Sequence, residues 1–172
     1  MPLKIVTYPN PLLGKTSQPI PEVTEEIRQL AQEMGELMYK SDGIGIAAPQ
    51  VGELLRLVVI DITGPEKREG KMVLVNPTVT PIMEGGLVES EEGCLSVPDY
   101  RAKVKRAGKV HVEATDLDGK PVSFDAEDML AICVQHEVDH LDGKLFIDRT
   151  SRLKRMMFEN KLKKGTRQSQ VK

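Results

Sequence analysis

Two stretches of the chain repeat apolar residues at helical spacing, and they differ in how much of the helix surface is apolar. Thr24 can cap a helix over residues 24–40, whose apolar positions form a single stripe. A second helix is expected to begin at Asp125, as its cap, and to end at Leu141, with Gly143 as its stop. Apolar residues surround most of this second helix. The pattern therefore predicts one peripheral helix and one central, buried helix.

Between these helices the chain holds segments typical of β-strands. Runs rich in β-forming residues, bounded by Gly, Pro and Asp, lie at residues 54–62, 72–80 and 109–115. Asp118-Gly119 predicts a hairpin turn into a further strand at 122–124. Strands in the middle and helices at either end indicate an α+β fold, in which mostly antiparallel sheets wrap around the central helix.

The end of the chain is basic. A third helix is expected over residues 151–164, followed by a polar, disordered tail at 165–172. Residues 149–172 contain nine Lys or Arg and one acidic residue, so they carry a formal charge of +8 in a chain of net charge −2. Such a cluster suits a polyanion such as RNA, and it equally suits a solvated helix face.

Length and composition fit one domain, which we place at residues 1–164. With no Trp, three Tyr and three Phe, the core must be built from aliphatic residues and Met, and recognition of bases by stacking is not expected. No segment reaches the apolar length that crosses a bilayer, and the start lacks a secretory or transit pattern. We expect a cytoplasmic protein that does not enter a membrane.

The strongest chemical signal is Gln-His-Glu-Val-Asp-His at residues 135–140. His136 and His140 are four residues apart, so on a helix both imidazoles lie on one face and can bind one ion. Glu137 is rotated off that line and can reach a water bound to the ion. The pattern predicts a hydrolytic metal centre on the second helix.

A hydrolytic metal usually takes a third protein ligand, and four residues are candidates. Cys133 lies seven residues before His140, roughly 10.5 Å along a helix, which is too far to share one ion with both histidines. It is better interpreted as an apolar wall residue. His111 lies in an alternating strand and fits a cross-strand role. Glu159 and Cys94 both remain: Glu159 follows at a spacing that some zinc peptidases use, and Cys94 follows a glycine that permits close backbone approach.

Three motifs, in this order, resemble the peptide deformylase family, in the class with the Glu-Gly-Cys-Leu-Ser motif. They are Gly-Ile-Gly-Ile-Ala-Ala-Pro-Gln at 43–50, Glu-Gly-Cys-Leu-Ser at 92–96, and the histidine motif at 135–140. Residues 5–13 are also similar to the start of that family. Its members are metal-dependent hydrolases that remove the formyl group from the N-terminal methionine of newly made proteins and release formate.

The resemblance implies a metal site and its chemistry. The ligands would be Cys94, His136 and His140, holding one divalent ion, Fe²⁺ in the cell, with Zn²⁺, Ni²⁺ or Co²⁺ also accepted. Glu137 would act as general base toward the attacking water and then as general acid toward the leaving amine. The Gln50 side chain and the Leu95 backbone amide would hold the developing oxyanion.

The resemblance also implies the partners and the residues that contact them. The substrates would be N-formyl-methionyl nascent peptides, and the basic C-terminal helix could dock on the ribosome. The methionine slot would be lined by one face of the second helix and by the loop before residue 45, and the peptide backbone would add as a strand between two segments. The residues involved are Ile44, Gly45, Gly93, Met129, Ile132 and Cys133, with Arg101 at the pocket mouth.

Overall fold

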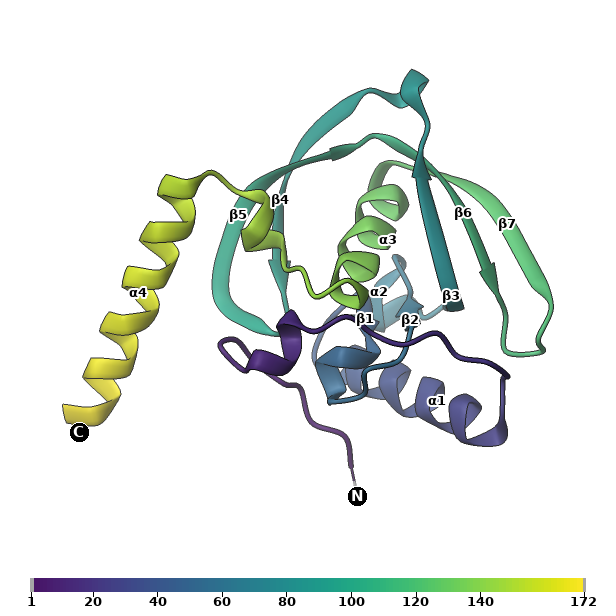
Figure 1. Cartoon of the computed structure of the whole chain (residues 1–172), viewed down its shortest axis with the longest axis horizontal. Coiled ribbons are helices and arrows are strands. Elements are labelled where there is room, and N and C mark those ends of the chain that lie inside the picture. The colour runs from purple at the N-terminus through teal and green to yellow at the C-terminus, as the bar shows by residue number, and fades with distance from the viewer. Residues whose placement is uncertain (1, 172) are drawn as a thin grey trace.

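A five-stranded and a two-stranded antiparallel sheet flank one helix, α3 (Asp128–Leu141) (Figure 1). The computed structural model describes the backbone of residues 2–171 and the side chains of residues 2–164. The strand order is β1-β2-β3-β6-β7 in the larger sheet, and β4 pairs with β5 in the smaller. The strands are β1 (Gly45–Ala47), β2 (Leu57–Ile60), β3 (Met72–Pro81), β4 (Leu87–Cys94), β5 (Val97–Ala107), β6 (Lys109–Thr115) and β7 (Pro121–Glu127). The predicted α+β class is confirmed.

Three further α-helices accompany α3 in the described part of the chain. They are α1 (Glu25–Lys40), α2 (Gly64–Lys67) and α4 (Arg152–Val171), and short 3₁₀ turns lie at η1 (Pro11–Gly14), η2 (Ala48–Val51), η3 (Met83–Gly85) and η4 (Phe146–Arg149). The first helix begins as predicted, because the Thr24 hydroxyl accepts a hydrogen bond from the Ile27 amide at 3.3 Å. No helix in the described part of the chain is long and apolar enough to cross a membrane.

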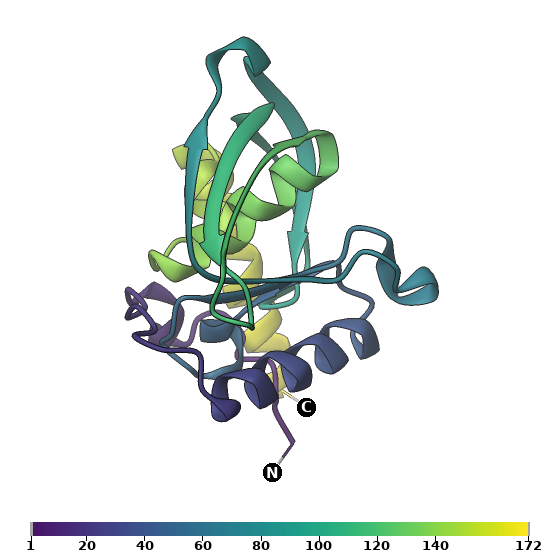
Figure 2. The same ribbon diagram turned by 90° about the vertical axis from the view of Figure 1, so that its right-hand side faces the viewer.

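Strand β2 separates two hydrophobic cores. Its four residues are all buried, and alternate side chains point to opposite faces of the sheet. Val58 and Ile60 pack in the core that contains α3, whereas Leu57 and Val59 pack in the core that contains α1. Figure 2 shows the two helices on opposite sides of the strands near β1 and β2. A register shift of one residue would exchange these faces, so burial on both sides fixes the pairing.

Helix α3 begins three residues later than predicted, and the proposed cap at Asp125 is wrong. Asp125 and Ala126 belong to β7, where they pair with His111 and Val110 of β6. The strand pairing with β6 therefore continues through residues that the apolar pattern had assigned to the helix. The rest of α3 is buried on most of its surface, as predicted, including both histidines and Glu137.

The sequence pattern missed the β4-β5 hairpin and strand β1. Strand β5 does alternate, with Ala102, Val104 and Arg106 buried, but the residues between them are charged and one of the buried residues is an arginine. Strand β4 is rich in glutamate and mostly exposed along its first half. A strand of this composition forms because of its partner, so its own apolar pattern does not reveal it.

Helix α4 lies beside β5 and extends away from the rest of the molecule (Figure 1). Its backbone is helical through Val171, beyond the predicted end at residue 164, where we expected a disordered tail. The side chains of 165–172 lie outside the described residues, so the domain boundary at 164 stays a prediction. Phe158 anchors the helix: it is 4% exposed, and its ring centroid lies 5.3 Å from that of Tyr8 and 4.6 Å from that of Tyr100.

Replacing this anchor should release α4. Because Phe158 is the buried aromatic residue of the helix, Phe158→Ala should cost roughly 3 kcal/mol of packing. We expect a lower urea midpoint and faster tryptic cleavage after the Lys and Arg residues of α4. Met156→Ala is the control, because Met156 is 53% exposed. Equal cleavage rates in the two variants would contradict the anchoring role.

Candidate metal centre

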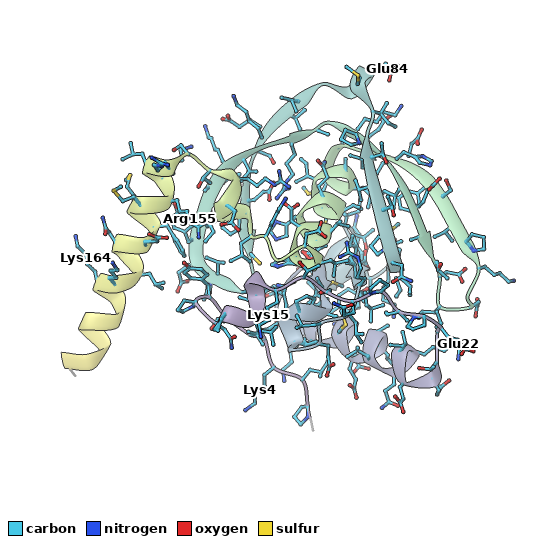
Figure 3. The ribbon with its side chains drawn as sticks, in the orientation of Figure 1. Lys4, Lys15, Glu22, Glu84, Arg155 and Lys164 are labelled. Atoms are coloured by element: carbon cyan, nitrogen blue, oxygen red, sulfur yellow. The ribbon has the colours of Figure 1, made fainter. Side chains whose placement is uncertain are left out.

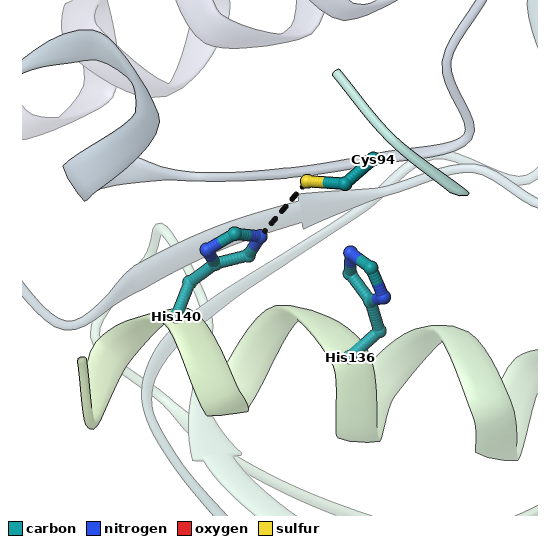
Figure 4. A group of neighbouring side chains, drawn as sticks. All are labelled: Cys94, His136 and His140. Atoms are coloured by element: carbon teal, nitrogen blue, oxygen red, sulfur yellow. Dashed lines mark hydrogen bonds between the residues drawn. The ribbon is translucent and has the colours of Figure 1, made fainter. Parts of the chain in front are cut away.

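A thiol and two imidazoles converge where the end of β4 meets α3 (Figure 4). One ligand atom from each of Cys94, His136 and His140 lies within 4.8 Å of the others. The Cys94 Sγ is 3.3 Å from the Nε2 of His140. The helical spacing places the two histidines on one face of α3, and the hairpin brings the cysteine to them from outside the helix. Within the described residues this is the only group of three or more such side chains close enough for one ion.

The other candidates for the third ligand lie elsewhere. Glu159 is on α4, where its carboxylate is 3.3 Å from Arg155. Figure 3 shows Arg155 on the side of α4 that faces the body of the molecule, where it also pairs with Asp148. His111 lies on β6 and bonds across the strands to Asp125 at 2.7 Å. Of the two alternatives that the sequence leaves open, the structure brings only Cys94 to the histidines.

His136 is oriented by a carboxylate behind it. Its Nδ1 lies 2.9 Å from an Oε atom of Glu92, so its Nε2 remains on the side of the metal group. Arg106 donates two hydrogen bonds to the same carboxylate, at 2.7 and 2.9 Å. Burial alone would raise the pKa of Glu92, but the hydrogen bonds from His136 and Arg106 hold it below its usual value. Glu92 is therefore a charged acceptor that fixes the ring.

The ion-pair network continues from Arg106 to the surface. Arg106 donates to Asp139 at 2.8 Å, and Arg149 of η4 donates to the same carboxylate at 2.7 and 2.9 Å. Glu92, Arg106 and Asp139 are buried, and each has a partner of opposite charge. The sequence analysis assigned no role to Arg106 or Arg149, and Glu92 and Asp139 entered only as members of the motifs at 92–96 and 135–140. Their signals were the glutamate directly before Gly93-Cys94 and the arginine on the buried side of an alternating strand.

Glu137 lies against the same centre with its carboxylate in a dry environment. The side chain is 4% exposed, one carboxylate oxygen is 3.7 Å from the Nε2 of His136, and the other has no hydrogen-bond partner among the described residues. Burial raises the pKa of this carboxyl to about 7, a range suited to both accepting and donating a proton. Gly45 packs directly against the Glu137 side chain. A Cβ at position 45 would lie 2.9 Å from the Cys133 sulfur and 3.0 Å from the Glu137 Cγ.

The donor set suits a divalent transition metal. Burial lowers the pKa of His140 well below its usual value, which favours the neutral imidazole that binds metal. A thiolate with two imidazoles is a ligand set for Zn²⁺, Fe²⁺ and their neighbours. Cys133, in contrast, is a wall residue: its sulfur is 3.8 Å from the Ile44 carbonyl, and burial raises the pKa of its thiol well above the usual value.

A cavity of about 740 Å³ opens over this centre. Its wall includes every residue that the resemblance implied would contact substrate: Ile44, Gly45, Gly93, Arg101, Met129, Ile132 and Cys133. Gln50 and Leu95 also line it. The Gln50 side chain is fixed, since its carbonyl accepts from the Ala47 amide at 2.9 Å while its Nε2 lies 3.5 Å from the Cys94 sulfur. The structure thus gathers all these residues around one space, and their individual roles remain predictions.

Comparison with known proteins agrees with this geometry. A family model described as polypeptide deformylase matches residues 2–156. Peptide deformylases of Acinetobacter baumannii and Acidobacterium capsulatum are 46% and 48% identical to the chain, over 96% and 95% of its length and 93% and 95% of theirs. The crystal structure of a peptide deformylase from Legionella pneumophila superimposes with a TM-score of 0.89 at 44% identity, covering 100% of this chain and 99% of that one. A peptide deformylase from Synechococcus elongatus in complex with actinonin has a TM-score of 0.87 at 37% identity, over 96% and 88%. The chain belongs to the polypeptide deformylase family.

Proposed function

We propose that the protein hydrolyses the N-formyl group from the N-terminal methionine of newly synthesised polypeptides and releases formate. The observation that carries this proposal is the convergence of Cys94, His136 and His140 beside the buried Glu137 carboxylate, where Cys94, His136 and Glu137 line one cavity. When bound by these three side chains, a divalent ion acts as a Lewis acid and makes water nucleophilic near neutral pH.

The protein's own groups would move the proton and stabilise charge. Glu137 accepts the proton of the attacking water and then delivers it to the leaving amine. The Gln50 Nε2 and the Leu95 amide donate to the oxyanion that develops on the formyl oxygen. Gln50 is 1% exposed and its carbonyl is held by the Ala47 amide, so its Nε2 is already oriented toward the Cys94 sulfur and the Ser96 hydroxyl before the charge appears.

Two open strand edges would hold the peptide backbone. β1 is one of the two edge strands of the larger sheet, and in the described part of the chain β4 pairs only with β5. Gly45 and Gly93 from these strands line the cavity. An extended peptide can add its hydrogen bonds to such edges. A side chain at Gly93 would meet Arg101 at 2.9 Å, so the glycine keeps this approach clear. The methionine side chain would lie against Ile44 and the face of α3 that carries Met129, Ile132 and Cys133.

We propose Fe²⁺ as the ion in the cell. The thiolate and imidazole ligands support this choice but accept Zn²⁺, Ni²⁺ and Co²⁺ as well. Because oxidation removes Fe²⁺ bound to a thiolate easily, the metal content should depend on how the protein is purified. The site of action would be the cytoplasm, where newly made chains carry the formyl group.

A second proposal concerns the basic helix. The outer surface of α4 carries exposed cations, including Lys163 and Lys164, and ribosomal RNA is a polyanion that such a surface can bind. Docking there would bring the cavity close to emerging chains.

Removing the base should abolish turnover. Glu137→Gln keeps the size of the side chain but cannot accept the proton, so we expect kcat for formyl-Met-Ala-Ser to fall about 10²–10⁴-fold with unchanged metal content. Formate release is the measurement. Glu159→Gln is the matched control and should retain the parent rate. A kcat of Glu137→Gln within twofold of the parent value would contradict the catalytic role of Glu137.

Replacing the thiol should weaken metal binding. A serine hydroxyl is a much poorer ligand for a soft divalent ion, so Cys94→Ser should lose metal to a chelator at concentrations at least about tenfold lower than the parent requires. The measurement is elemental analysis of protein purified without oxygen, which also identifies the ion. Cys133→Ser should keep its metal. If Cys94→Ser retained its metal as the parent does, Cys94 would not be the third ligand.

Reversing charge on α4 should weaken ribosome association. Lys163→Glu with Lys164→Glu replaces two exposed cations, and we expect reduced co-sedimentation with ribosomes at low salt and a smaller dependence on salt concentration. Deformylation of a short peptide should stay at the parent rate. Unchanged co-sedimentation would exclude this surface as the docking site.

A further inference from the structure

A second groove lies between β5 and α4, next to the cavity over the metal centre. It has a volume of about 370 Å³ and is lined by Tyr100, Arg101 and Ala102 of β5 and by Lys154, Met157 and Lys161 of α4. Tyr100 and Arg101 also line the larger cavity. The two spaces therefore share part of their wall, and a chain that leaves the larger cavity past Arg101 would reach the groove.

The charged residues of the groove are all cations. Within the described part of the chain, neither Lys154 nor Lys161 forms an ion pair; the Lys161 ammonium lies 6.0 Å from the centre of the Tyr100 ring. Arg101 donates a hydrogen bond to the Glu91 backbone carbonyl at 3.4 Å, and its contact with the exposed Glu91 carboxylate is 3.8 Å long. Among the side chains that the structure describes, no acidic residue lines the groove. Its charge thus complements a carboxylate.

The three α4 residues are held facing β5. Positions 154, 157 and 161 are spaced three and four residues apart, so they share one face of the helix. Phe158, packed between Tyr8 and Tyr100, fixes the helix on the hairpin, and Arg155 pairs with Asp148 from η4. The cations of this face therefore stay at the groove, whereas Arg152 and Lys163 lie on the opposite face of the same helix.

We propose that this groove is an extension of the substrate site that binds acidic side chains of the polypeptide a few residues after its formyl-methionine. The inference rests on the proposed function. With the formyl group at the metal centre and the methionine against α3, an extended chain advances about 3.3 Å per residue toward the mouth. Residues from about the third onward then pass Arg101 and reach Lys154 and Lys161. The groove would select substrates by charge, and the first two residues would be selected by the larger cavity.

The test compares peptides that differ only beyond the second residue. Formyl-Met-Ala-Asp-Asp-Asp-amide and formyl-Met-Ala-Ser-Ser-Ser-amide are assayed at low salt, and each kcat/KM is divided by that of formyl-Met-Ala-amide with the same enzyme. We expect an advantage of about threefold to tenfold for the acidic peptide, mainly in KM, because two or three exposed ion pairs contribute modestly. The advantage should shrink in 0.5 M salt.

Matched variants locate the effect. Lys154→Ala with Lys161→Ala should remove the advantage, and Lys154→Glu with Lys161→Glu should transfer it to formyl-Met-Ala-Lys-Lys-Lys-amide. Arg152→Ala with Lys163→Ala removes the same amount of charge from the opposite face of α4. This variant should keep the advantage for the acidic peptide. Equal ratios for the acidic and serine peptides in the parent enzyme, or an advantage lost in both alanine pairs, would overturn the groove as a subsite. Failure to hydrolyse formyl-Met-Ala-amide would instead count against the proposed function.

Discussion

The ion pair between Glu92 and Arg106 is the interaction on which the arrangement of the metal centre depends. The two side chains are 4% and 2% exposed, and an unpaired charge in such a place would cost several kcal/mol. Glu92 lies on β4, Arg106 on β5, and their partners His136 and Asp139 on α3. One buried network therefore docks the hairpin on the helix and orients His136, a candidate metal ligand. Because Cys94 ends the same strand β4, this docking also places the thiol beside the imidazoles.

The relation between sequence and structure differs from one part of this network to the next. The two histidines were predictable because a helix places positions 136 and 140 on one face, and Thr24 was predictable as a cap because capping is local. The choice between Cys94 and Glu159 was not, since it depends on which distant segment packs on α3. The motif resemblance pointed to Cys94, and the packing brings that residue to the site. Arg106 was missed for a similar reason, because nothing local distinguishes it from the exposed Lys103 and Lys105 around it.

The open strand edges carry a risk of unwanted pairing with other chains, and they also form part of the cavity wall. Open edges such as those of β1 and β4 expose unpaired backbone groups that invite pairing with other chains. Here both contribute to the wall of a cavity, beside glycines that leave room for a backbone. The five-stranded sheet thus supplies stability through β2, buried on both faces, and in the proposed binding mode it supplies recognition through β1 at its edge.

The contact between Tyr8 and Phe158 joins the first and last parts of the chain. Such a contact between distant residues cannot form until both have been made. During synthesis, every residue of the metal centre leaves the ribosome before Phe158 does. The residues of the centre therefore become available for folding before Tyr8 can meet its aromatic partner on α4.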